Sequence, residues 1–190
     1  MIRLLTHVDF LSNLGYFRCI EGKVESAKKL SSLPFDCICF TGSSFTGRLV
    51  AIEAAKNLTP CVLELGGKCP VIVDETASLD SAAMRILFGK YLNCGQTCIG
   101  VDHVFVHEAV KEKFRKVLLQ KIDEMWGKQE FVDNENYGKI INVHHTRRIE
   151  AMLKEEHGGK VLYGGDVNVE KHMISPTIIE EPKRESQMMN

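Results

Sequence analysis

Two hydrophobic patterns alternate along this chain: short apolar runs typical of buried strands, and longer stretches with the spacing of amphipathic helices. Together they predict strands at 16–20, 35–40, 61–65, 70–73, 103–106, 161–163 and 177–179, and helices at 25–33, 46–58, 79–91, 108–126 and 144–154. Strands that alternate with helices indicate an α/β fold with a mainly parallel sheet covered by helices. The polar stretch 127–136 is expected to be a loop.

The longest predicted helix, 108–126, carries apolar residues at helical spacing on one face. This pattern is typical of core packing rather than of a ligand site. The residues concerned are Val110, Phe114, Val117, Leu118, Ile122 and Met125.

A glycine turn, Thr41-Gly42-Ser43, joins the strand at 35–40 to the helix at 46–58. Strand, turn and helix in this order place backbone N–H groups and the positive helix end against a phosphate. The spacing from Gly42 to Gly47 lacks the Lys-Ser/Thr of a P-loop and the third glycine of a dinucleotide fingerprint. From these residues alone, an ordinary turn and helix start is an equally good interpretation.

Glu64 ends an apolar run, Cys61 to Leu65, that we expect to be a short buried strand before Gly66 and Gly67. An apolar pocket raises the pKa of a carboxyl group, which tunes it toward general-base catalysis near neutral pH. The alternative is a carboxylate that is exposed or paired with Lys68, and for Glu64 considered alone this is the better interpretation.

Cys98 lies at the end of Asn93-Cys94-Gly95-Gln96-Thr97-Cys98. A thiol attacks only as thiolate, so a catalytic cysteine needs an activating environment. Gly95 permits a tight turn, after which the amide N–H groups of Gln96, Thr97 and Cys98 can face an oxyanion. A buried, inert cysteine is the alternative.

Four segments in this order resemble the aldehyde dehydrogenase superfamily: Phe40-Thr41-Gly42-Ser43, Leu63 to Lys68, Gly95 to Cys98, and Ser175-Pro176-Thr177-Ile178. The flanking stretches 57–60 and 89–94 are similar to the class 3 group, which includes fatty-aldehyde enzymes. The resemblance covers the chain from about Tyr16 to its end. It implies an α/β fold of the aldehyde dehydrogenase type, with a partial Rossmann-type dinucleotide-binding lobe at 1–66. A partial α/β catalytic lobe carrying the nucleophilic cysteine is expected at 67–190.

The resemblance implies oxidation of an aldehyde to a carboxylic acid with NAD or NADP. Cys98 would form a thiohemiacetal and then a thioester, and Glu64 would activate the hydrolytic water, in a cleft between the lobes. The residues implied to bind the cofactor are Thr41, Gly42, Ser43, Gly47, Leu65 and Gly66.

The chain departs from the family pattern in two ways. Cys69 stands where the family usually has serine or another small residue. The chain also lacks three family segments: a Pro-Trp-Asn segment, the lysine that holds the adenosine ribose, and a Glu-Glu-x-Phe-Gly-Pro segment. We therefore expect an internal fragment with weak or no activity of its own.

Three alternatives to a catalytic chain stay open at this point. One is a non-catalytic nucleotide-binding or regulatory module. Another is a structural fragment that docks on a full-length homologue. A third is a thiol redox protein with a Cys94–Cys98 disulfide, although the chain has no CxxC spacing.

Composition narrows the partners and the compartment. A net charge of −1 is not basic enough to suggest nucleic acid as a partner. Seven cysteines without zinc-finger spacing predict reduced thiols in the cytoplasm and no metal site. The apolar N-terminal stretch is too short for a signal peptide or membrane span. The expected partner is a small-molecule aldehyde, and a homodimer is left open.

Overall fold

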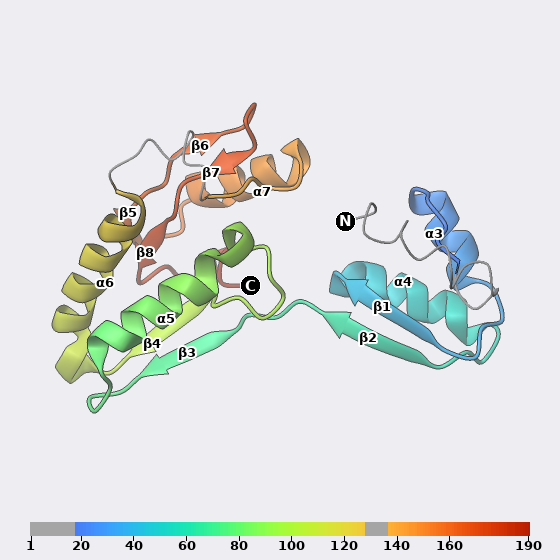
Figure 1. Cartoon of the computed structure of the whole chain (residues 1–190), viewed down its shortest axis with the longest axis horizontal. Helices are drawn as coiled ribbons and strands as arrows, with labels where there is room; N and C mark the ends of the chain where they lie inside the picture. Colours follow the sequence, from blue (N-terminus) through green and yellow to red (C-terminus); the bar gives the residue numbers. More distant parts are fainter. Residues whose placement is uncertain (1–17, 128–136) are drawn as a thin grey trace. The chain divides into compact units, whose positions relative to one another are not determined.

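The computed structural model describes residues 18–127 and 137–190, which divide between two units, unit 1 (1–65) and unit 2 (66–190) (Figure 1). The strand expected at 16–20 lies partly outside the described residues, and residues 18–20 are not in a strand. The loop expected at 127–136 lies outside them except for Gly127.

Unit 1 contains a parallel pair of strands, β1 (Ile38–Gly42) and β2 (Cys61–Leu65), with helices α3 (Val24–Ser31) and α4 (Ser44–Ala55). Helix α4 packs against both strands, and α3 packs against α4. Gly47 makes the close approach of α4 possible, because a Cβ there would lie 2.8 Å from a methyl carbon of Leu65.

Strand β2 is more exposed than its apolar sequence predicts. Val62, Leu63 and Glu64 are exposed, and only the two end residues are half-buried. The expectation of a buried strand is therefore wrong, because an apolar run does not reveal how many faces of a strand the rest of its unit covers.

The first half of unit 2 is a second parallel pair, β3 (Pro70–Val73) and β4 (His103–Val106). Helix α5 (Leu79–Tyr91) connects them and packs against helix α6 (Lys111–Trp126). A 3-10 turn, η2 (Glu108–Val110), precedes α6, so the long helix begins three residues later than expected. Its apolar face is core as predicted, since Phe114 and Ile122 are buried and three further members of that face pack on the two core clusters.

The second half of unit 2 contains helix α7 (Val143–Lys154) and four short strands. Strand β5 (Lys160–Tyr163) pairs with β8 (Ile178–Glu180), and β6 (Val167–Asn168) pairs with β7 (Met173–Ile174). Both pairs are antiparallel, so the expected mainly parallel sheet is wrong for this part of the chain. For β6 and β7 the reason is the short link between them, since parallel strands need a long crossover connection.

The Ser175-Pro176-Thr177-Ile178 segment stabilises a glycine turn after β5. Ser175 Oγ accepts a hydrogen bond from the Asp166 N–H (2.9 Å), and Thr177 Oγ1 accepts one from the Gly165 N–H (3.0 Å). The buried Tyr91 hydroxyl donates to the Thr177 carbonyl (2.8 Å). This segment therefore connects the C-terminal strands to α5.

Candidate functional site

The loop that carries Cys98 begins with a left-handed turn. After α5 the chain enters a 3-10 turn, η1 (Leu92–Gly95), in which Asn93, Cys94 and Gly95 have φ values of 53°, 56° and 75°. For a residue with a side chain, this conformation costs on the order of 1 kcal/mol or more, and such strain is concentrated at functional sites. Other contacts must therefore hold the turn.

The Gln96 side chain provides such contacts. Its Nε2 donates to the carbonyl oxygens of Asn93 (3.1 Å) and Lys139 (3.0 Å), while its Oε1 accepts from the Ile141 N–H (2.9 Å). The bonds to Lys139 and Ile141 connect the Cys98 loop to residues 139–141, and the bond to Asn93 closes the turn on itself. No spacing rule in the sequence indicates this contact, because the partners lie more than 40 positions away.

The structure corrects the expected set of oxyanion donors. The backbone N–H of Gln96 already donates to the Asn93 carbonyl (3.1 Å). Within the part of the chain that the structure describes, the N–H groups of Thr97 and Cys98 have no hydrogen-bond acceptor. Two of the three expected donors are therefore available to an oxyanion.

Cys98 and Cys94 differ in their surroundings. The Cys98 side chain is exposed, whereas Cys94 is half-buried against the core cluster that contains Tyr137. Burial raises the pKa of the Cys94 thiol, although contacts with Gly138 and Tyr137 oppose this effect. The thiolate is the reactive form of a cysteine, and a raised pKa lowers the fraction of thiolate. Cys94 is therefore a poor nucleophile.

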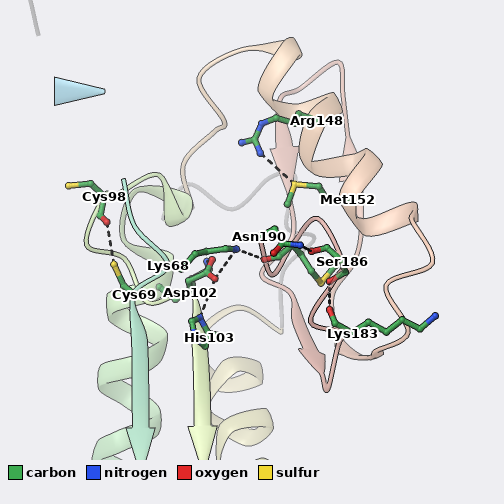
Figure 2. A network of polar contacts seen from close by, with 12 residues as sticks. Lys68, Cys69, Cys98, Asp102, His103, Arg148, Met152, Lys183, Ser186 and Asn190 are labelled. Atoms are coloured by element: carbon green, nitrogen blue, oxygen red, sulfur yellow. Dashed lines mark hydrogen bonds and ion pairs between the residues drawn. The ribbon is translucent and has the colours of Figure 1, made fainter. Parts of the chain in front are cut away.

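A network of charges joins the starts of β3 and β4 (Figure 2). Asp102 Oδ2 lies 3.1 Å from Lys68 Nζ and 3.4 Å from His103 Nδ1, and Lys68 also donates to the Met188 carbonyl. Lys90 Nζ lies 4.0 Å from Asp102 Oδ1. Burial lowers the pKa of Lys90, and the nearby Asp102 carboxylate opposes this shift.

The predicted cofactor residues of unit 1 gather at the carboxyl ends of its two parallel strands. In the register of the pair, Thr41 lies opposite Glu64 and Gly42 opposite Leu65. Ser43 follows directly and caps helix α4. Thr41 and Gly42 thus belong to the strand rather than to the turn that the sequence predicted. Ligands of open α/β sheets bind at this edge.

The start of α4 suits a phosphate group. Ser43 Oγ accepts the N–H of Thr46 (3.2 Å), and the N–H groups of Ser44 and Phe45 have no acceptor within the helix. No acidic residue lies in the first turn, so the positive helix end is not neutralised there. A Cβ added at Gly42 would lie 2.5 Å from the end of the Phe40 ring, so a larger residue there would displace that ring.

The remaining predicted site residues are divided between the units. Glu64 is exposed on unit 1, which matches the exposed carboxylate preferred for Glu64 considered alone and not the apolar pocket. Gly66 and Cys98 belong to unit 2, and a Cβ added at Gly66 would meet no atom within 4 Å.

Among residues 18–127 and 137–190, no group of three metal-ligating side chains is placed to hold an ion. No helix in these ranges is long and apolar enough to cross a membrane.

Comparison with known proteins gives a consistent result. The sequence profile of the aldehyde dehydrogenase family matches residues 14–190. The 4,4'-diaponeurosporen-aldehyde dehydrogenase of Staphylococcus aureus is 38% identical over 189 residues, which are 100% of this chain and 40% of that protein. Aldehyde dehydrogenase family 3 member I1, chloroplastic, of Arabidopsis thaliana is 40% identical over 183 residues, which are 95% of this chain and 33% of that protein.

Solved structures agree with the sequence relatives. The substrate-bound state of Staphylococcus aureus AldH superimposes with a TM-score of 0.85 at 38% identity, covering 92% of this chain and 38% of that chain. The chain thus spans between one third and two fifths of the length of these proteins. The predicted resemblance, including its class 3 character, is confirmed.

Proposed function

Because the chain belongs to the aldehyde dehydrogenase family, whose members are NAD(P)-dependent oxidoreductases, we propose that it supplies the nucleophile and part of the cofactor site for oxidation of an aldehyde to a carboxylic acid. The observation that carries this proposal is the Cys98 loop. Its thiol is exposed, the Thr97 and Cys98 N–H groups have no acceptor among the described residues, and the Gln96 side chain anchors the turn.

The edge formed by β1, β2 and the start of α4 fits the phosphates of a dinucleotide. We assign Thr41, Gly42, Ser43, Gly47, Leu65 and Gly66 to this cofactor, as the family resemblance implies. NAD or NADP, when bound, supplies the hydride acceptor. The capped helix start with its free N–H groups supports a phosphate contact there.

Cys98 performs the covalent step. Its sulfur adds to the carbonyl carbon of the aldehyde, and the carbonyl electron pair moves to the oxygen. The Thr97 and Cys98 N–H groups stabilise that negative charge, each donor of this kind being worth about 10²–10³ in kcat. Loss of hydride from the same carbon leaves a thioester on Cys98.

Glu64 completes the cycle as the base. Its carboxylate accepts a proton from water, the resulting hydroxide attacks the thioester carbonyl, and the Cys98 thiolate leaves as the carboxylic acid forms.

All seven cysteines are free thiols, which supports a reducing compartment such as the cytoplasm for this chemistry.

Two measurements on the chain test the proposal. The first is NADH or NADPH formation from an aldehyde. The second is mass spectrometry of the chain after reaction with a 4-nitrophenyl ester, which acylates an activated thiol without any cofactor. We expect an acyl group on Cys98, its accumulation in Glu64→Gln, and its absence in Cys98→Ser.

Cys94→Ser is the matched control and should acylate as the wild type does. Acylation spread over several cysteines would contradict the proposal. Cofactor binding that persists while Cys98 stays unreactive would instead favour a non-catalytic nucleotide-binding module.

A further inference from the structure

Cys69, the residue at which this chain departs from the family pattern, lies beside the nucleophile loop. Its Sγ is 3.3 Å from the backbone carbonyl oxygen of Cys98 (Figure 2). A carbonyl oxygen is about 2.4 Å from its own Cα, so the Cys69 sulfur lies within about 5.7 Å of the Cys98 Cα. In a disulfide, each sulfur is roughly 4 Å from the partner Cα. The distance from the Cys69 sulfur to the Cys98 Cα therefore exceeds the disulfide value by at most about 2 Å.

The Cys98 side chain supplies the required freedom. In Figure 2 its sulfur points away from Cys69, while the Cys69 sulfur points toward the Cys98 carbonyl. Because Cys98 is exposed, rotation about its Cα–Cβ bond is unhindered by a packed core and occurs within nanoseconds. That rotation changes which side of its backbone the thiol occupies.

The neighbouring backbone is fixed on both sides of this contact. The Cys69 carbonyl accepts the Asp102 N–H (3.0 Å), and the Gly100 N–H donates to the Thr97 carbonyl (2.9 Å). The ion pair between Lys68 and Asp102 adds a side-chain connection at the same level. The approach of the two cysteines is thus part of the ordered start of β3 and β4.

Cys94, by contrast, is directed elsewhere. Its thiol contacts Tyr137 and the backbone of Gly138, and a Cβ added at Gly138 would lie 3.1 Å from its sulfur. A Cys94–Cys98 disulfide, the pairing that the sequence suggested, would require Cys94 to leave this packed position. Cys69 is therefore the better partner.

We propose that Cys69 is a resolving cysteine for Cys98, so that a hydroperoxide converts the pair into a reversible disulfide that blocks the nucleophile. The inference rests on the proposed function of Cys98 for its effect on activity. The disulfide itself depends only on the geometry of the two residues.

The chemistry takes two steps. The Cys98 thiolate attacks the terminal oxygen of the peroxide, the O–O bond breaks, and Cys98 sulfenic acid forms with release of water or an alcohol. The Cys69 thiolate then attacks the Cys98 sulfur, the S–S bond forms, and hydroxide leaves to be protonated to water. Two thiols lose two electrons in total, and the peroxide gains them.

This reaction has a protective consequence. A sulfenic acid without a partner thiol is oxidised further to the sulfinic acid, which ordinary thiols do not reduce. A disulfide stops the oxidation at a stage that a dithiol reverses by exchange. Cys69 would thus preserve the nucleophile during exposure to peroxide.

Peptide mapping of the full chain tests the proposal. The chain is treated with hydrogen peroxide, remaining thiols are alkylated with iodoacetamide, and the product is digested with trypsin. Cleavage after Lys68, Arg85, Lys90 and Lys111 gives peptides 69–85 and 91–111. The second peptide contains both Cys94 and Cys98, so Cys94→Ser is used beside the wild type to assign the link.

We expect a cross-link between peptides 69–85 and 91–111 in both proteins. Cys98 alkylation should fall at least about tenfold with peroxide and return with dithiothreitol. In Cys69→Ser we expect no cross-link, and Cys98 should progress to the sulfinic acid and not recover.

A disulfide within peptide 91–111 would overturn the proposal. So would equal formation of Cys98 sulfinic acid in wild type and Cys69→Ser. Its failure is distinguishable from failure of the proposed function by the labelling before peroxide is added. Selective alkylation of Cys98 without the cross-link contradicts the disulfide alone, whereas the cross-link without selective alkylation supports the disulfide and contradicts the catalytic role.

Discussion

Replacing Gln96 with alanine should release the loop that carries Cys98. The side chain makes three hydrogen bonds, to Asn93, Lys139 and Ile141, and each contributes about 0.5–1.5 kcal/mol net. Because Gln96 is exposed, values near the lower end apply, which gives a total of about 1.5–3 kcal/mol. The left-handed conformations of Asn93 and Cys94 cost about 2 kcal/mol together.

These two magnitudes are similar, and this similarity sets the expected result. Without the Gln96 side chain, the strain of the left-handed pair is no longer offset, so the turn should relax to ordinary backbone conformations. Relaxation recovers the backbone strain of about 2 kcal/mol, so we expect the free energy of unfolding to fall by no more than about 1 kcal/mol, less than the lost hydrogen bonds alone would give. The Ile141 amide should also lose its protection from hydrogen exchange.

Urea unfolding and hydrogen exchange followed by mass spectrometry measure the two effects. Gln120→Ala is the matched control. Gln120 donates a surface hydrogen bond to Glu124 on α6 (2.8 Å), the one bond of its side chain among the described residues, so the substitution should lower the free energy of unfolding by less than about 0.5 kcal/mol. Gln96→Glu keeps an acceptor for the Ile141 N–H but loses both donated hydrogen bonds, so its stability should resemble that of Gln96→Ala. The reasoning is refuted if Gln96→Ala matches Gln120→Ala in stability and Ile141 stays protected.

Three further perturbations have defined outcomes. Gly164→Ala should destabilise unit 2 by more than about 3 kcal/mol in thermal unfolding, because φ is +70° and the new Cβ would clash with the Pro176 carbonyl oxygen. The control Gly66→Ala places its Cβ in open space and should leave the unfolding temperature nearly unchanged. Burial raises the pKa of Tyr91 and of Tyr137, so the unfolded chain loses these protons first, and stability should fall as pH rises above about 10. Tyrosinate absorbance should then rise together with the loss of ellipticity, and a separate earlier titration of both hydroxyls would contradict this. Asp102→Asn should lower the free energy of unfolding by about 1–2 kcal/mol, because it leaves the half-buried Lys68 and Lys90 without their shared carboxylate. An unchanged midpoint of urea unfolding would contradict the network.

Local pattern predicted the helices of this chain well. The expected helices at 79–91 and 144–154 are α5 and α7 within one residue, because the spacing of apolar positions sets which helix face packs. Helix α4 begins two residues before its predicted start. The reason is Ser43, which caps the helix and was interpreted as part of a turn.

Features that depend on distant residues were not predictable. The exposure of β2 depends on how many layers cover it, and the pairing of β5 with β8 joins strands that residues 164–177 separate in the chain. Among site features, the sequence indicated Cys98 and the glycine turn before α4. The anchoring of the loop by Gln96 and the approach of Cys69 to Cys98 involve contacts across 29 to 45 positions, for which no local signal exists.

The most direct test of the proposed nucleophile is site-resolved iodoacetamide labelling of the intact chain at neutral pH, with and without NAD. We expect Cys98 to react faster than the other six cysteines, and Cys94 to react slowly because burial raises its pKa. Labelling of Cys98 that responds to NAD would support the nucleophile and its cofactor together. Labelling of Cys98 at the same rate as the exposed Cys37 and Cys39 would contradict an activated thiol at this position.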